Sequence, residues 1–136
     1  MNRIIELPEF TDSRGGLTVA ESINNVPFDI QRAYWVYDVP ENEERGGHSH
    51  KVSKEFIIAL KGSFCVTLDN GKESKTFVLD KPNRGLLVNP DTWHSLDRFS
   101  NDAVCLVFSS EKYDKSDYIN TYSEFKKYVD SKSCKD

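Results

Sequence analysis

The residues best suited to chemistry in this sequence are its histidines. The chain has three, His48, His50 and His94. His48 and His50 lie two positions apart, so on a β-strand their side chains would point to the same face, and the preceding stretch Arg45-Gly46-Gly47 is rich in glycine. Two imidazoles facing one cavity can transfer protons near neutral pH or ligate a metal ion. The alternative is a pair of hydrogen-bonded structural or surface histidines.

Short β-strands are the elements that must position these side chains. Stretches rich in β-branched and aromatic residues recur between turn signals. They cover residues 17–20, 33–37, 55–60, 63–68, 74–79, 85–88, 93–96 and 103–108. Asp69-Asn70-Gly71, between two of them, is a strong hairpin signal. About nine short strands at this spacing predict an all-β sandwich or barrel of the jelly-roll kind.

The C-terminal part of the sequence has a helical period instead. Apolar side chains recur every three or four residues from Tyr118 to Val129, which predicts a short helical segment at about 114–130. Ser123 is the candidate cap of its last helix. We expect the aromatic face of this segment to pack on the sheet.

Length and charge limit the classes of function. The 136 residues fit one domain, and no linker or repeat divides them, so we expect a single domain over 1–136. The 18 basic and 22 acidic residues give a net charge of -4. This charge disfavours nucleic acid and anionic membranes as partners, although a few clustered arginines can still hold a small anion.

The sequence also indicates a cytoplasmic location. No stretch approaches the length of a membrane span, and the first nine residues, which include Pro8, do not resemble a signal peptide. The three cysteines, Cys65, Cys105 and Cys134, are odd in number and form no CxxC pair. They are typical of reduced thiols, two of them in core strands, rather than of a disulfide frame or a zinc knuckle.

The histidines lie in a pattern that resembles the two motifs of the cupins. The matching stretches are His48-x-His50-x4-Glu55-x6-Gly62 and Gly85-x4-Pro90-x3-His94. The second departs from the usual pattern, with Thr92 in place of a glycine and Arg98 in place of an asparagine. The resemblance implies a jelly-roll barrel with the histidines at its mouth, and it fixes no activity because cupins have many functions.

A narrower resemblance covers most of the chain. The sequence is similar to the WxcM-like dTDP-4-keto-6-deoxyglucose 3,4-ketoisomerases. The similar stretches are Asp12-Ser13-Arg14-Gly15, residues 32–38, residues 45–51, Trp93-His94 and Tyr113-Asp114-x2-Asp117-Tyr118-Ile119-x2-Tyr122-x2-Phe125. This resemblance implies an isomerase without metal or other cofactor and a dTDP-linked keto-sugar as substrate. It also implies a homodimer with exchanged N-terminal strands and arginines that clamp a pyrophosphate.

The implied reaction assigns roles to particular residues. Moving a carbonyl from C4 to C3 through an enediol needs a base, an acid and polarised oxygens. We expect His48 to be the principal acid/base, and His50 to share the proton transfers or orient the sugar hydroxyls. Tyr34 is either a hydrogen-bond partner for the C3 or C4 oxygen or a core residue.

Arginines are the expected substrate-binding residues. Arg14 is the strongest candidate, because a guanidinium recognises phosphate in bidentate fashion. Arg32 and Arg45 are either further substrate-binding residues or exposed surface charges.

Three other functions fit the same residues. A metal-dependent cupin oxygenase would use His48, His50, Glu55 and His94 as ligands. A nucleotide-sugar 3,5-epimerase would share the Asp-x-Arg-Gly stretch, and a sugar-binding cupin would lack catalysis. The sequence is compatible with a galacto or a gluco product and with thymidine or uridine.

Overall fold

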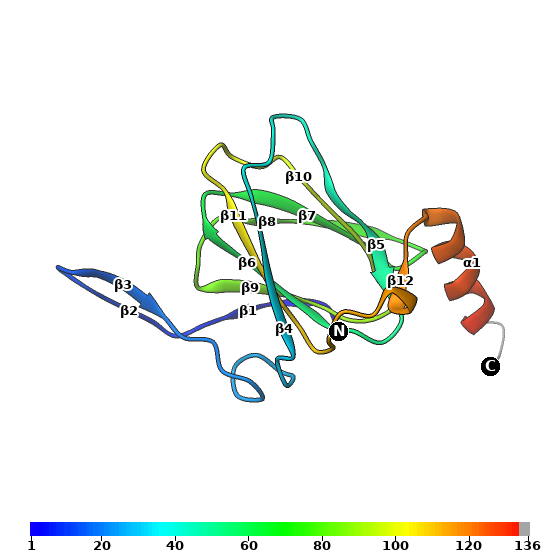
Figure 1. Ribbon diagram of the computed structural model, residues 1–136, viewed down its shortest axis with the longest axis horizontal. Coiled ribbons are helices and arrows are strands. Elements are labelled where there is room, and N and C mark those ends of the chain that lie inside the picture. Colours follow the sequence, from blue (N-terminus) through cyan, green and yellow to red (C-terminus); the bar gives the residue numbers. More distant parts are fainter. Residues whose placement is uncertain (134–136) are drawn as a thin grey trace.

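The computed structural model describes residues 1–133 and consists of two five-stranded antiparallel sheets with a projecting hairpin and a C-terminal helix (Figure 1). The elements are β1 (Arg3–Glu6), β2 (Glu9–Asp12), β3 (Gly15–Thr18), β4 (Arg32–Tyr37), β5 (Arg45–His50), β6 (Glu55–Lys61), β7 (Phe64–Asp69), β8 (Ser74–Leu79), β9 (Arg84–Val88), β10 (Trp93–Asp97), β11 (Val104–Ser109), a 3-10 turn (Lys115–Asp117), β12 (Tyr118–Ile119) and α1 (Tyr122–Ser133). The predicted all-β sandwich with a short C-terminal helix is therefore confirmed.

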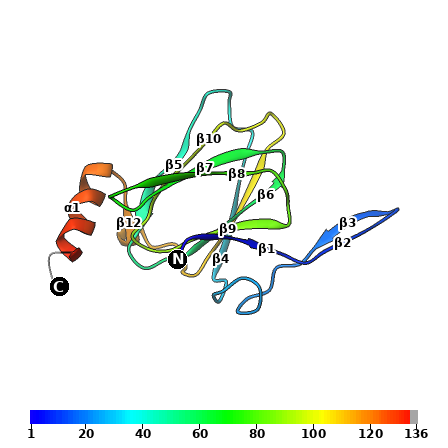
Figure 2. The same cartoon turned by 180° about the vertical axis from the view of Figure 1, so that it is seen from behind.

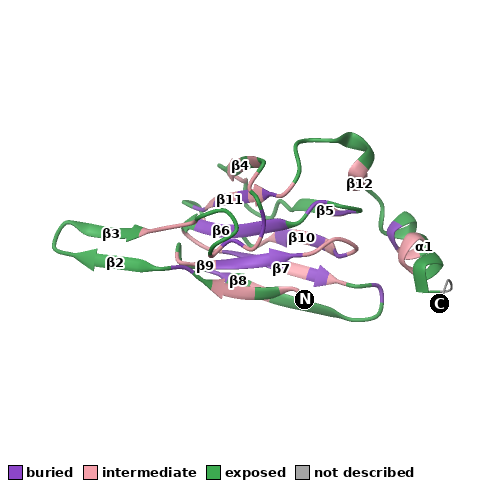
Figure 3. Ribbon diagram, turned by 90° about the horizontal axis from the view of Figure 1, so that it is seen from below, coloured by how far each residue is buried: buried purple, intermediate pink, exposed green. Residues whose placement is uncertain are grey.

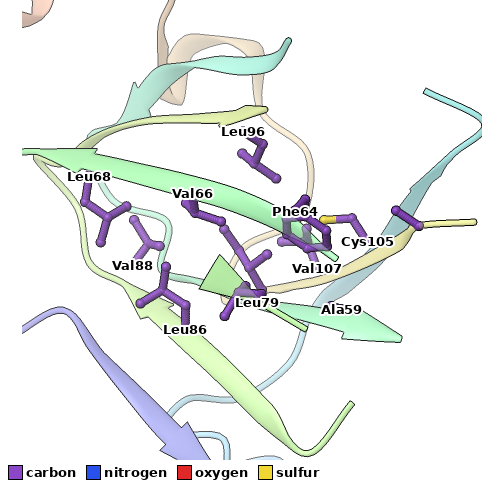
Figure 4. Packing of buried hydrophobic residues seen from close by; sticks show 12 residues of the cluster. Ala59, Phe64, Val66, Leu68, Leu79, Leu86, Val88, Leu96, Cys105 and Val107 are labelled. Atoms are coloured by element: carbon purple, nitrogen blue, oxygen red, sulfur yellow. The ribbon is translucent and has the colours of Figure 1, made fainter. Parts of the chain in front are cut away.

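The two sheets face each other across the main core. Their strand orders are β1-β9-β6-β11-β4 and β12-β5-β10-β7-β8. Along β11 every second side chain is buried, as a strand with one face on a core requires. Figure 4 shows the apolar side chains from both sheets that fill this space, among them Val66, Leu86, Leu96 and Val107.

A tight turn carries the chain from the first sheet to the second between β6 and β7. Gly62 has φ +67°, a left-handed conformation that glycine adopts without steric cost. A Cβ atom there would collide with the Ser100 hydroxyl and the Ala103 backbone. The glycine of the first cupin-like motif is thus required by packing at this turn.

The hairpin β2–β3 lies apart from the sandwich. It forms a two-stranded sheet of its own and pairs with no other strand of the described chain. Figures 1 and 2 show it projecting from one end of the molecule, opposite α1. Figure 3 shows it as exposed along its length, and Phe10 and Leu17 are 63% and 58% exposed.

The C-terminal segment differs from its prediction. Residues 114–119 form a 3-10 turn and the strand β12, which pairs with β5, so the helix begins only at Tyr122. Pairing with β5 outweighs the local helical period here. Ser123 lies inside the helix, and the cap is Thr121, whose hydroxyl accepts a hydrogen bond from the Glu124 N–H at 3.3 Å. The aromatic packing is as expected, since Phe125 is fully buried.

Two further features predicted from the sequence are reduced thiols in core strands and the absence of a membrane span. Cys65 and Cys105 are buried free thiols in strands, as expected, and Cys134 lies outside the described residues. Across residues 1–133, no helix has the length and apolar character needed to cross a bilayer.

Candidate active site

Strands β5 and β10 bring the three histidines together at one end of the sandwich. His48 and His94 are directly opposite each other in the β5–β10 pairing. The ring centroid of His48 lies 5.1 Å from that of His50 and 4.5 Å from that of His94. The two histidines of β5 therefore share a face, as their spacing predicts. Gly46 has φ +80°, and a side chain there would press on the backbone oxygen of His94 at 3.2 Å.

His50 lies between two carboxylates. Its Nδ1 is 3.0 Å from Asp117 Oδ2, and its Nε2 is 2.8 Å from Glu55 Oε1. A carboxylate only accepts hydrogen bonds, so the Asp117 contact places a proton on Nδ1. The Nε2 contact is a short ion-pair contact rather than an aligned hydrogen bond. The His50 side chain is almost completely buried, so both contacts are shielded from water.

Glu55 is the hub of the polar groups behind the histidines. Its Oε1 accepts a 3.4 Å hydrogen bond from the Tyr34 hydroxyl, and its Oε2 accepts one from the Ser109 hydroxyl. Nη2 of Arg32 lies 3.9 Å from Oε1 and donates to the Tyr118 hydroxyl at 3.0 Å. These contacts account for a carboxylate that is only 1% exposed.

His48 and His94 are held in the neutral form. Burial lowers the pKa of His48 to about 4, with a further contribution from the neighbouring His50. Burial, and then the charges of the other two histidines, lower the pKa of His94 to about 3. His94 Nδ1 donates to the Thr92 carbonyl at 3.2 Å. Nε2 of His48 is buried and has no hydrogen-bond partner among the described residues, so it is a free base.

The same cluster can be tested as a metal site. One nitrogen from each of the three histidines lies within 4.8 Å of the others, a grouping that could hold an ion. His50, however, already engages Asp117 through Nδ1 and Glu55 through Nε2. Because a metal ligand needs a free nitrogen lone pair, His50 would have to leave one carboxylate. The arrangement therefore does not fit a resident three-histidine metal centre.

A cavity of about 80 Å³ adjoins the cluster. Tyr34, Glu55, His48 and His94 line it together with Arg45. Tyr34 is partly buried, and desolvation of its hydroxyl raises the pKa, so the hydroxyl stays protonated. Arg45 is an exposed residue at the start of β5 that contributes to the cavity wall.

The predicted substrate-binding arginines lie in different places. Arg32 is half-buried and packs 4.9 Å above the Tyr34 ring, so it belongs to the wall of the site rather than to the open surface. Arg14 lies at the tip of the hairpin β2–β3, is 88% exposed and pairs only with Asp12, at 2.6 Å. Within this chain Arg14 is therefore not part of the histidine cluster.

Two residues of the site had been given no role from the sequence. Asp117 contacts His50, and the Tyr118 ring packs 4.4 Å from the His50 ring and 5.1 Å from the His48 ring. Both were assigned to a helix, whereas in the structure they precede it and lie beside β5. The sequence feature that could have identified them is the stretch Asp117-Tyr118-Ile119, which is part of the resemblance to the WxcM-like ketoisomerases.

Known proteins resemble this chain over most of its length. The model of the FdtA family (WxcM-like, C-terminal) matches residues 1–130. A TDP-4-oxo-6-deoxy-alpha-D-glucose-3,4-oxoisomerase of Aneurinibacillus thermoaerophilus is 41% identical over 128 residues, which cover 94% of this chain and 92% of that protein.

Solved structures give the same result. The chain resembles a sugar 3,4-ketoisomerase from Thermoanaerobacterium thermosaccharolyticum in complex with TDP, with a TM-score of 0.94, 34% identity and 96% of each chain covered. A histidine-to-asparagine mutant of that enzyme was solved in complex with TDP-4-keto-6-deoxyglucose. An epimerase of Mycobacterium tuberculosis, 13% identical with a TM-score of 0.74 over 88% of this chain and 68% of that one, shares the fold.

The family match spans nearly the whole chain. The oxoisomerase and the ketoisomerase are 41% and 34% identical to it, which is more than a shared fold alone requires. These matches confirm the predicted family and its isomerase class. The chain belongs to the FdtA family of WxcM-like sugar ketoisomerases.

Proposed function

We propose that this chain converts TDP-4-keto-6-deoxyglucose to a TDP-3-keto-6-deoxyhexose by 3,4-ketoisomerisation. The relatives that cover almost the whole chain carry this activity in their names, and one was solved with this keto-sugar. The structural observation that carries the proposal is the pairing, in one buried cluster, of an unpartnered neutral histidine with a histidine held between two carboxylates. Such a pair supplies the base and the acid that an enediol pathway needs.

His48 is the base in this proposal. Its pKa of about 4 leaves it neutral at pH 7, and its buried Nε2 makes no other hydrogen bond within the described residues. It takes the C3 proton, which the neighbouring C4 ketone acidifies, and the electron pair moves to the C4 oxygen as the enediol forms. A neutral imidazole needs no further activation for this step.

His50 and Glu55 together are the proton donor in this proposal. The short contact between His50 Nε2 and Glu55 Oε1 holds a proton next to the cavity that His48 and Tyr34 also line. Transfer of the C3 hydroxyl proton to the C4 oxygen, and protonation of C4 by the His50–Glu55 pair, leave a ketone at C3 and a hydroxyl at C4. The proton that His48 took from C3 then returns to the pair through solvent. Tyr34, kept protonated by burial, is placed to hydrogen-bond the sugar oxygens.

Substrate binding requires a second copy of the chain in this proposal. Arg14 lies on a hairpin that pairs with nothing else in the described chain, and Phe10 and Leu17 on that hairpin are exposed. The outer side of the edge strand β4 exposes Trp35 and Tyr37, 60% and 61%. We infer a homodimer in which exchanged N-terminal strands cover such apolar surface and bring Arg14 to the pyrophosphate at the other copy's site. Arg45 and Arg32 flank the site from within the chain.

The test is NMR of the product formed from TDP-4-keto-6-deoxyglucose in deuterated buffer. We expect the ketone to move to C3, whereas a 3,5-epimerase would leave it at C4 and exchange the hydrogens at C3 and C5. An unmoved ketone overturns the proposed function. The rate should be the same in excess chelator, because the cluster does not fit a resident metal.

His48→Asn tests the assignment of the base. We expect turnover to fall about 1,000-fold, the range that a positioned base contributes, with the unfolding transition and TDP binding retained. Undiminished turnover in a folded His48→Asn protein would remove His48 from the mechanism while leaving the activity itself established.

A further inference from the structure

One carboxylate, that of Asp117, organises both His50 and the turn that follows it. Oδ1 accepts hydrogen bonds from the backbone N–H groups of Lys51 and Val52 at 3.1 and 2.7 Å, and Oδ2 accepts one from Ser53 at 3.3 Å. Oδ2 also accepts the 3.0 Å hydrogen bond from His50 Nδ1. Asp117 is only 10% exposed, so these charge-assisted contacts are largely protected from water.

The segment that carries Asp117 is itself fixed in place. The backbone carbonyl of Asp117 accepts a hydrogen bond from the Lys51 N–H at 3.0 Å. The strand β12 begins at the next residue, Tyr118, and pairs with the end of β5. On the other side, Asp114 caps the 3-10 turn by accepting from the backbone N–H of Ser116. The carboxylate is therefore held by elements on both sides of it.

This geometry settles how the His50 ring is oriented. Because Asp117 accepts from Nδ1, that nitrogen carries a proton, and Nε2 faces Glu55 and the catalytic cluster. Without Asp117 the ring could rotate or exchange its tautomer, and Nε2 would no longer be held against Glu55 and the cluster. A carboxylate that fixes a catalytic imidazole in this way acts on the reaction without touching substrate.

We propose that Asp117 is a positioning residue for the isomerisation, acting through the orientation and tautomer of the His50 ring rather than as a support for the 51–53 turn alone. This inference rests on the proposed function for its kinetic consequence, although the state of the His50 ring can be measured independently of any activity.

Three variants separate the two roles. Asp117→Asn keeps an oxygen that can accept from the Val52 N–H but loses the charge that His50 faces. Asp117→Ala loses both. Asp114→Asn is the matched control, because Asp114 caps the same 3-10 turn but is itself exposed, and its side chain hydrogen-bonds to Ser116 and not to a histidine. We expect kcat to fall about 100-fold in Asp117→Asn with KM nearly unchanged, and the control to keep wild-type kinetics.

Nitrogen NMR of the imidazole rings provides the second measurement. The chain has three histidines, so the ring spectrum contains three sets of signals, and the set lost in His50→Asn identifies His50. In the wild type, Nδ1 of His50 should be protonated, and in Asp117→Asn its shift should change while the set of His94 stays in place. A folded Asp117→Asn protein with wild-type kcat, or with an unchanged His50 signal, would overturn the proposal. An inactive wild type would instead contradict the proposed function and leave the ring measurement to decide the role of Asp117.

Discussion

The histidine cluster and the hairpin β2–β3 are opposite cases within one chain. In the cluster, polar side chains from several strands meet in a buried space, and His50, Glu55 and His94 are at most 3% exposed. In the hairpin, all four residues of β2 are exposed, and Arg14 contacts only Asp12 two positions away. Both regions belong to the stretches that mark the family.

In the proposed dimer, this difference separates the half of the site that one chain builds by itself from the half that the other copy completes. Proton transfer needs groups fixed to within a fraction of an ångström, and burial between two sheets provides that. Binding an anion needs only a positive charge on a segment that can reach it, such as Arg14 on the hairpin β2–β3. The exposed Arg14–Asp12 pair contributes little to stability, so its place in the family pattern is better explained by binding than by folding.

The largest expected effect of this contrast comes from mixing two variants with different defects. Arg14→Ala should weaken substrate binding strongly, with KM rising about 10-fold or more, and His48→Asn should abolish turnover. If Arg14 serves the other copy's site, refolding the two together in equal amounts restores about a quarter of the sites, because half the dimers are mixed and each has one intact site.

The control is the two variants refolded separately and combined only in the assay. Recovery measured at substrate concentrations below KM distinguishes the two arrangements. If Arg14 acted within its own chain, every site in the mixture would carry one defect, and the activity would not rise above that of the Arg14→Ala sites alone. Light scattering of each variant would show whether the assembly itself is kept.

A second prediction concerns the loss of stability at low pH, which the histidine cluster should cause and the hairpin should not. Burial holds the pKa of His48 at about 4 and that of His94 at about 3, whereas both rise to about 6.5 in the unfolded chain. The unfolded state therefore binds protons first as the pH falls. The stability is fully present above pH 6.5, and we expect the free energy of unfolding to drop by about 3 kcal/mol for each of these two histidines between pH 6.5 and 4.

Urea unfolding at several pH values measures this loss. His48→Asn should show a shallower dependence, since one of the two buried imidazoles is gone, and Arg14→Ala should follow the wild type. An equally steep dependence in His48→Asn would mean that acid acts elsewhere in the protein.

The sequence predicted most of the sandwich because strand signals are local. The alternation along β11 and the turn at Asp69-Asn70-Gly71 were both readable, and Asn70 does accept hydrogen bonds from the two residues that follow Gly71. The segment 114–119 was misassigned because its conformation is set by pairing with β5, a contact between residues 68 apart in the Tyr118–His50 pair.

The site could be predicted only in part for the same reason. Spacing alone places His48 and His50 on one face, but nothing local indicates that Asp117 reaches His50 from behind. Nor does the sequence show that Arg32 lies in the wall of the site while Arg14 projects from the molecule. These facts depend on how strands from distant parts of the chain are ordered.

Tyr34→Phe is the smallest of the expected effects and sharpens the contrast within the cluster itself. The Tyr34 hydroxyl reaches Glu55 through a 3.4 Å hydrogen bond, whereas Glu55 also holds His50 and Ser109 more closely. Losing one long hydrogen bond should change the free energy of unfolding by about 1 kcal/mol or less. We expect kcat to fall only about 10-fold, because His48 and His50 remain. A loss as large as that of His48→Asn would make Tyr34 the proton donor to the sugar, and wild-type kcat would make it a core residue.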